Sequence, residues 1–236
     1  MHSPSKTPSS PRIHPWIALR ASVKMLRNPH DLQAAADLAL AVDGSCAERL
    51  FQRFAADPRG IRILEEQRVI LRLLADRDYL ASMPDGSLAR AYLDWMDEQG
   101  FAAESLQALF EDPSCERGRD NCDHRLLVAN RMRDLHDLWH VVTGYSRDLV
   151  GEAALMSFSY QQVGTRIFGL MLPLITAYVA VRAPRALPLV LQAKRRARKA
   201  DWFAVVDWEG LLHRPLHEVR EELRVGPAPV YDLIPF

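Results

Sequence analysis

Two histidines and two carboxylates lie within seventeen residues of this chain, in the run His136-Asp137-Leu138-Trp139-His140 and at Glu152. On an α-helix, positions four apart lie on one face, so His136 and His140 can direct their ring nitrogens at a common ion. Asp137 lies about 100° around such a helix, near enough for its carboxylate to join them. Imidazole nitrogens and carboxylate oxygens suit Zn²⁺, Fe²⁺ or Mn²⁺. We therefore interpret these residues as a candidate metal site.

Glu152 can reach the histidines only if the chain reverses direction after His140. A straight helix would carry Glu152 roughly 18 Å beyond His140. Gly144 supplies a break, because glycine is the usual residue in the left-handed conformation that ends helices. A second helix that begins near Asp148 would then bring Glu152 back beside the first. The sequence thus predicts a helical hairpin with metal ligands from both arms.

Other interpretations of these histidines and of a second pair remain open. A His-x-x-x-His pair also occurs on helices by chance, and Asp137 could instead form an ion pair on a solvated face. No glutamate lies between the two histidines, so the His-Glu-x-x-His arrangement of zinc proteases is absent. His213 and His217 have the same spacing, but Pro215 is typical of the first turn of a new helix running to Leu223. We expect that second pair to lie on the surface.

Composition limits the classes of function. The chain has 236 residues, of which 48% are hydrophobic, enough for a large core. Thirty basic and thirty acidic residues cancel, so there is no global electrostatic case for nucleic-acid binding. Between Glu152 and Asp201 the chain has no acidic residue but eight arginines and lysines, which predicts a cationic surface. Three cysteines do not make a disulfide framework, which favours a reducing compartment.

Helical signals dominate the chain and favour an all-α fold. Residues 1–15 are rich in serine and proline, lack the hydrophobic run of a secretory signal, and are interpreted as a disordered tail. Residues 16–236 are interpreted as one all-helical domain. Apolar spacing and capping residues predict helices over Trp16–Leu26, Leu32–Val42, Ser45–Ala56, Ile61–Leu74 and from Ser87 to Gln99, with turns at Asp57–Gly60 and Met83–Gly86. Only Trp202–Val206 alternates as a strand would.

The segment Ile167–Val181 is uncharged and almost wholly apolar. Its fifteen residues fall short of the roughly twenty needed to span a bilayer, and Pro173 would kink it. One interpretation is a buried core helix. Another is a helix that lines a pocket for a long apolar ligand or dips into a membrane surface, with the following basic run near phosphate headgroups.

Several motifs occur together in the order found in one protein family. These are Lys24–Pro29 (KMLRNP), Met83–Leu88 (MPDGSL), Arg133–His140 (RDLHDLWH), Gly144, Gly151-Glu152, and the helix from Pro215 to Leu223. Together they resemble the ubiquinone-biosynthesis family named after the fourth coenzyme Q assembly protein, over roughly residues 16–229. The resemblance implies an all-helical protein whose metal ligands, usually zinc, are His136, Asp137, His140 and Glu152.

The resemblance also implies a function and a location. The family is implicated in removing the C1 carboxylate of a polyprenylated 4-hydroxybenzoate, of the 4-hydroxy-3-methoxy-5-polyprenyl type, coupled to oxidation at that carbon. The alternative is a non-catalytic scaffold that presents the lipid and organises the other ubiquinone biosynthesis enzymes, with a structural metal. Either role implies peripheral attachment at the cytoplasmic face of a bacterial inner membrane, or at the matrix side of the mitochondrial inner membrane in a eukaryote. A homodimer is left open.

The identity of the metal bears on the choice between these roles. A zinc ion can hold the carboxylate or phenolate of the substrate but cannot accept electrons, so oxidative decarboxylation with O₂ favours Fe²⁺. Four protein ligands would also leave no open position on a tetrahedral ion unless one ligand were labile. Asp137 is the expected labile ligand, because its side chain leaves the helix at a different angle from the histidines.

Overall fold

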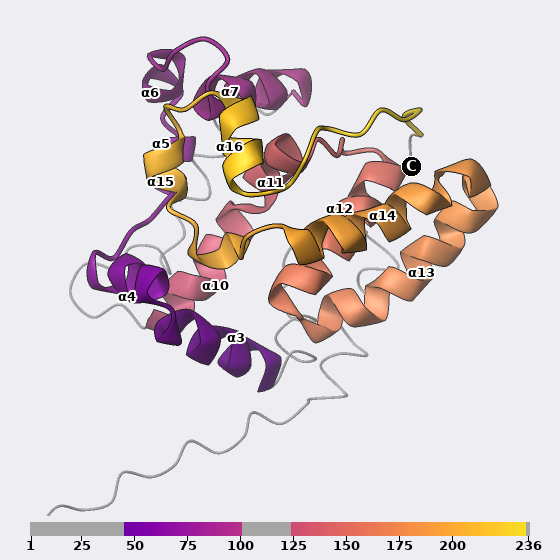
Figure 1. Cartoon of the computed structure of the whole chain (residues 1–236), viewed down its shortest axis with the longest axis horizontal. Helices are drawn as coiled ribbons and strands as arrows, with labels where there is room; N and C mark the ends of the chain where they lie inside the picture. Colours follow the sequence, from indigo (N-terminus) through magenta and orange to yellow (C-terminus); the bar gives the residue numbers. More distant parts are fainter. Residues whose placement is uncertain (1–44, 101–123, 235–236) are drawn as a thin grey trace, which may run out of the picture.

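The computed structural model describes residues 45–100 and 124–234, and the described parts are helical (Figure 1). The predicted tail over residues 1–15 and the predicted helices Trp16–Leu26 and Leu32–Val42 lie outside the described residues. Within the described residues the helices are α3 (Ser45–Ala56), α4 (Pro58–Glu65), α5 (Leu71–Leu74), α6 (Arg77–Ala81), α7 (Leu88–Glu98), α10 (His124–Asp134), α11 (His136–Thr143), α12 (Leu149–Val163), α13 (Arg166–Arg182), α14 (Leu187–Lys199), α15 (Trp208–Leu211) and α16 (Leu216–Glu222), with 3₁₀ turns η2 (Pro184–Ala186) and η3 (Phe203–Val205). The predicted all-α class is confirmed.

Helix α11 lies in the middle of the described structure and contacts α7, α10, α12 and α16 (Figure 1). Helices α3 and α4 occupy one end, and α12, α13 and α14 pack together at the other. The larger hydrophobic core includes Trp139 of α11, Phe158 of α12 and Phe203 of η3, whose rings pack edge-on or tilted at 5.1–5.4 Å between centroids. The helix that carries both candidate histidines is therefore anchored in the core.

Several predicted helix boundaries are confirmed. Helix α3 covers the predicted Ser45–Ala56. Helix α7 begins after Ser87, whose side-chain oxygen accepts the Arg90 backbone N–H at 3.3 Å, and Gly100 follows it with a φ of 68°. These boundaries depend on capping residues that act locally, which is why the sequence reveals them.

The prediction of one helix over Ile61–Leu74 after a turn at Asp57–Gly60 is wrong. The helix begins earlier, at Pro58, because Asp57 caps it and proline suits the first helical position. It ends at Glu65, and Gln67 adopts a left-handed φ of 47°, so α5 is a separate short helix.

The predicted strand Trp202–Val206 is also wrong, since it contains the 3₁₀ turn η3. All five of its residues are buried, although only alternate side chains of a half-buried strand would be. No strand pairs with it among the described residues, which contain only an isolated antiparallel bridge between Ser87 and Pro215. Pro215 itself stands just before α16, in the cap position rather than in the first turn.

The apolar run Ile167–Val181 forms most of α13, at the edge of the structure (Figure 1). The interpretation as a buried core helix is wrong, because Val179 is the one buried residue of α13. Leu174 is 61% exposed and Val181 80% exposed, and Leu170 and Tyr178 share the same side of the helix at spacings of three and four. No helix in the described parts is long and apolar enough to cross a membrane.

Candidate metal centre

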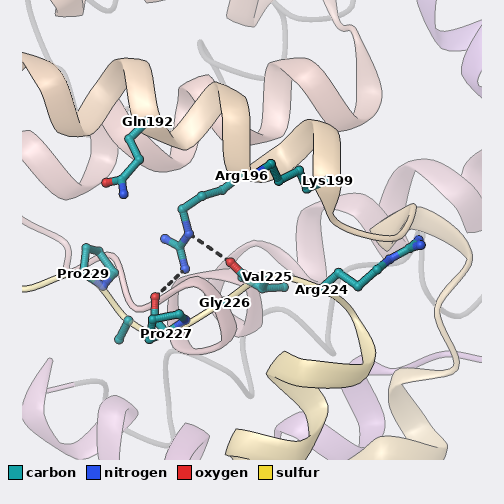
Figure 2. A pocket seen from close by; sticks show the side chains of 9 residues that line it. Gln192, Arg196, Lys199, Arg224, Val225, Gly226, Pro227 and Pro229 are labelled. Carbon is teal, nitrogen blue, oxygen red and sulfur yellow. Dashed lines mark hydrogen bonds between the residues drawn. The ribbon is translucent and has the colours of Figure 1, made fainter.

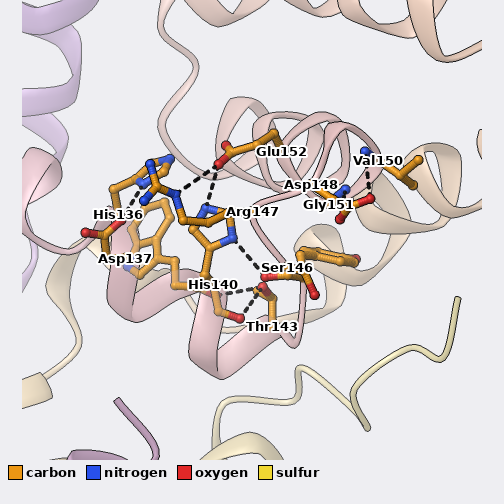
Figure 3. A network of polar contacts seen from close by, with 12 residues as sticks. His136, Asp137, His140, Thr143, Ser146, Arg147, Asp148, Val150, Gly151 and Glu152 are labelled. Carbon is orange, nitrogen blue, oxygen red and sulfur yellow. Dashed lines mark hydrogen bonds and ion pairs between the residues drawn. The ribbon is translucent and has the colours of Figure 1, made fainter. Parts of the chain in front are cut away.

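His136, His140 and Glu152 converge in the structure, as Figure 3 shows. One ligand atom from each of the three lies within 4.8 Å of the other two. His136 and His140 belong to α11 and Glu152 to the first turn of α12, so the chain reverses between them as predicted, while metal binding by both arms stays a prediction. Two ring nitrogens and one carboxylate oxygen at this separation can share one divalent ion.

The ring of His140 is oriented for metal binding. Its Nδ1 lies 2.8 Å from the backbone carbonyl oxygen of Tyr145, which can only accept, so Nδ1 carries the proton and donates. When the ring is neutral, the opposite nitrogen, Nε2, therefore presents a lone pair. It is buried without a hydrogen-bond partner among the described residues and lies 3.4 Å from Oε1 of Glu152. A neutral imidazole nitrogen and a carboxylate oxygen are both acceptors, and a metal ion between them would satisfy both, so the residues fit a metal ion.

Asp137 does not join the three converging residues. Its Oδ1 lies 3.2 Å from Nδ1 of His136, on the neighbouring position of the same helix. A carboxylate that binds one ring nitrogen of a histidine orients the other nitrogen toward a metal. The structure therefore gives Asp137 the geometry of an orienting group for His136, and its role as a ligand stays a prediction.

The carboxylates of the site are ionised near neutral pH. Burial raises the pKa of Glu152, but the hydrogen bond and charges of His140 and then His136 outweigh it and hold the pKa below its usual value. The pKa of Asp137 is lowered in the same way, since the contact with His136 outweighs burial. Both carboxylates can therefore offer ionised oxygens to a metal ion.

The turn between the two helices depends on close packing at glycines. Gly144 ends α11 with a φ of 76°, and a Cβ atom there would lie 2.4 Å from Cβ of Ala228 in the tail after α16. Asp148 caps α12 by accepting the backbone N–H of Gly151 at 3.1 Å. A Cβ atom on Gly151 would lie 1.9 Å from the carbonyl oxygen of Ser146. Glycine is thus required on both sides of the turn that returns Glu152 to the histidines.

Comparison with known proteins connects this geometry to a family. The family model described as "Coenzyme Q (ubiquinone) biosynthesis protein Coq4" matches residues 4–229. The chain belongs to the Coq4 family.

Named relatives and a solved structure agree with that assignment. The mitochondrial ubiquinone biosynthesis protein COQ4 of Arthroderma otae is 28% identical over 227 residues, which cover 94% of this chain and 81% of that protein. The corresponding protein of Caenorhabditis elegans is 27% identical over 234 residues, 96% of each chain. A crystal structure of a candidate ubiquinone biosynthesis protein from Nostoc punctiforme superposes with a TM-score of 0.64 at 19% identity and covers 91% of this chain and 99% of that one, which shows a shared fold.

Two arginines hold the end of α11 in this Coq4 chain. Arg220 of α16 donates to the carbonyl oxygens of Val141 and Val142, each at 3.0 Å, and Arg196 of α14 donates to that of Thr143 at 3.0 Å. These are the last carbonyls of the helix, which have no partner within it. Burial, followed by the charge of Arg196, lowers the pKa of Arg220. The sequence places Arg196 only within a basic run, because no local signal marks a contact across more than fifty residues.

Trp95 of α7 is a second neighbour that the sequence did not reveal. Its ring stacks on that of His140, with centroids 5.6 Å apart and an interplanar angle of 22°. The ring of His140 is thus fixed by a hydrogen bond at Nδ1 and by an aromatic face. His213 and His217 are exposed, as predicted.

Proposed function

We propose that this protein is a metal-dependent decarboxylase of ubiquinone biosynthesis that removes the C1 carboxylate of a polyprenylated 4-hydroxybenzoate. The proposal rests on one observation above all, the convergence of two histidines and one carboxylate, rather than four ligands, among the described residues. Sites with three protein ligands keep positions open for substrate, whereas structural zinc sites are usually closed by four. Membership of the Coq4 family supports the pathway.

The types of ligand also limit which metal ion could bind. Two histidines and one carboxylate occur in catalytic zinc sites and in Fe²⁺ oxygenases with open positions. When bound, the ion would hold the substrate carboxylate or phenolate and, if it is Fe²⁺, support oxidation by O₂. Fe²⁺ suits oxidative loss of CO₂ better than Zn²⁺, and Mn²⁺ fits the same ligands.

The side chains around the ligands have separate roles in this proposal. Nε2 of His140 and Oε1 of Glu152 are donors to the metal, and Asp137 orients the ring of His136. Arg147, whose Nε lies 3.7 Å from Oε1 of Glu152, brings a positive charge to the edge of the site. A substrate carboxylate that approaches the metal would meet that charge, which favours a benzoate.

We also propose that α13 attaches the protein to a membrane surface, where a polyprenylated substrate would reside. Its exposed apolar side chains, such as Leu174 and Val181, would enter the boundary between headgroups and acyl chains. Arg166 begins the helix, Arg182 ends it and Arg185 follows, so the ends suit anionic lipids and would repel the same face of a second copy. Leu174→Glu should weaken binding to neutral and anionic vesicles alike, and unchanged binding would contradict this role.

The alternative function is a scaffold that presents the lipid to other ubiquinone biosynthesis enzymes, with a structural metal. Burial of His140 in the core favours it, because a metal at that position would contribute to folding. The two functions differ in whether the isolated protein turns over substrate.

The deciding experiment uses the purified full-length chain. Its metal is identified by elemental analysis, and CO₂ release from a 4-hydroxybenzoate with a short prenyl chain is measured with and without air. The proposal expects release that depends on the metal, stops in His140→Ala and persists in His217→Gln, the exposed histidine control. Release only in air identifies the oxidative reaction. No release with Fe²⁺, Mn²⁺ or Zn²⁺ would overturn the enzyme proposal and favour the scaffold.

A further inference from the structure

A pocket lies between α14 and the tail that follows α16 (Figure 2). Its volume is about 300 Å³. On the α14 side it is lined by Gln192, Arg196 and Lys199, and on the tail side by residues 224–229. The tail contributes Arg224 and small or apolar residues, among them Pro227 and Pro229. The pocket therefore combines cationic groups with an apolar floor, and no acidic residue lines it.

Among the described residues, no carboxylate neutralises the cations of this pocket. Arg196, Lys199 and Arg224 form no ion pair with a carboxylate in the described residues, nor does Arg220, whose pKa is influenced by Arg196. Arg131 provides the contrast, because it is buried and donates to both carboxylate oxygens of Glu209 at 2.6 and 2.9 Å. The chain thus pairs a buried arginine with an acid elsewhere but leaves the pocket with excess positive charge.

Arg196 is held in place without losing its charge. Its Nε donates to the carbonyl oxygen of Val225 at 3.1 Å, and its Nη2 donates to those of Pro227 and Thr143 at 3.0 Å each (Figure 2 shows the two tail contacts). Its Nη1 is buried and has no hydrogen-bond partner among the described residues. The guanidinium also lies over the ring of Tyr145, 5.1 Å from its centroid, so it is fixed in place and its positive charge is suited to an oxyanion.

Arg224 adds a conformational argument. Its φ is 55°, in the left-handed region where a long side chain costs about 1 kcal/mol or more compared with glycine. Gly226, two residues later, also has a left-handed φ, so the tail uses glycine at its other left-handed position. Arg224 directly follows Leu223, the C-cap of α16, so it turns the chain into the tail that lines the pocket, and its own side chain extends away from Arg196 (Figure 2).

We propose that this pocket binds a phosphate-class oxyanion. Three cations at the pocket and Arg220 behind it balance a doubly charged phosphate better than a single carboxylate. The amide of Gln192 adds a neutral donor at the edge. The same phosphate chemistry could come from free phosphate or from a lipid headgroup, and the apolar tail residues fit either. The pocket is separate from the metal site, and its binding needs no substrate turnover.

The test compares two variants of the full-length, metal-loaded protein. Lys199→Gln/Arg224→Gln removes the two exposed pocket cations and keeps Arg196, which supports the fold. Lys194→Gln removes a lysine of the same helix that does not line the pocket. Calorimetry measures binding of inorganic phosphate, and co-sedimentation measures binding to phosphatidylcholine vesicles with and without phosphatidylglycerol.

The pocket variant should weaken phosphate binding by about tenfold or more, while Lys194→Gln changes it by less than about twofold. If free phosphate does not bind but the pocket variant alone loses the extra affinity for phosphatidylglycerol vesicles, the oxyanion is a lipid headgroup. Equal losses in the pocket variant and in Lys194→Gln would overturn the pocket, because they would reflect general charge. So would the absence of both phosphate binding and any vesicle effect of the pocket variant.

Discussion

The metal hairpin and the pocket between α14 and the tail both contain polar groups without a partner. These groups are acceptors in the hairpin and a donor in the pocket. In the hairpin, Nε2 of His140 and Oε1 of Glu152 face each other as two acceptors 3.4 Å apart. In the pocket, Arg196 keeps a buried donor without an acceptor. The first arrangement calls for a cation and the second for an anion. Such groups indicate a ligand only together with the charges around them, because other buried groups, such as Nε1 of Trp139, also lack a partner among the described residues.

The two regions are also physically connected through α11. Its histidines point into the hairpin, and its last carbonyl groups accept hydrogen bonds from Arg196 and Arg220. Arg196 is the residue common to both regions. Some substitutions should therefore change only metal binding or only phosphate binding, and others should change both.

The largest effect is expected from His140→Ala, which removes one of three converging donors. The variant should lose metal retention altogether but keep its phosphate binding, since the pocket lies elsewhere. Elemental analysis after gel filtration measures the metal, with His217→Gln as the exposed control. Metal retained at the wild-type ratio would contradict the site.

Asp137→Asn tests whether Asp137 is a metal ligand or only orients the ring of His136. Loss of an orienting contact typically lowers metal affinity by about 10- to 100-fold without abolishing it. Competition with a chelator measures that affinity. Loss as complete as in His136→Ala would instead make Asp137 a ligand.

Gly144→Ala should be the next most severe change. Its φ of 76° and the 2.4 Å approach of Ala228 predict a loss of roughly 2 to 4 kcal/mol in unfolding free energy. Gly164→Ala is the matched control, because Gly164 ends α12 with a φ of 67° and open space around it, and should lose about 1 kcal/mol. Urea unfolding measures both. Equal losses would mean that the tail does not constrain the hairpin turn.

Arg196→Gln tests the connection between the two regions. The loss of its charged donors to three carbonyl groups should cost about 2 kcal/mol of stability. It should weaken both phosphate and metal binding, whereas Lys199→Gln/Arg224→Gln should weaken only phosphate binding. If metal affinity is unchanged in Arg196→Gln, the two regions act independently.

The smallest effect is expected from Arg224→Gly, which should raise stability but lower phosphate affinity. Relief of the left-handed backbone should raise the unfolding free energy by about 1 kcal/mol, while loss of the cation weakens phosphate binding. Thermal unfolding and calorimetry on the same sample measure the two effects. Gln67→Gly, at the other left-handed position with a side chain, is the control that should stabilise without changing phosphate binding.

The sequence predicts what local signals determine. Gly144, Asp148 and the spacing of His136 and His140 are enough to anticipate the hairpin, because a left-handed glycine, a helix cap and a helical period act within a few residues. The histidine spacing alone could not separate Asp137 from the converging residues, since the direction of each side chain depends on its neighbours.

Contacts between distant segments are not accessible in this way. The stacking of Trp95 on His140 joins residues 45 positions apart, and nothing in either sequence segment signals it. The sequence left two interpretations of α13 open for a related reason, because an apolar run does not show whether protein, a ligand or a membrane covers it. The strand predicted from the alternation at Trp202–Val206 is wrong because a strand needs a neighbouring strand to pair with, and none of the described residues provides one.

The stacked rings of Trp95 and His140 have a practical consequence. An ion bound at Nε2 would draw electron density from the imidazole and so change the surroundings of the indole against which it packs. The intrinsic fluorescence of the protein should therefore respond to metal loading, and the response should disappear in Trp95→Phe. A paramagnetic ion such as Fe²⁺ should quench this emission more strongly than Zn²⁺, so the colour and intensity of one tryptophan can report which metal the protein holds.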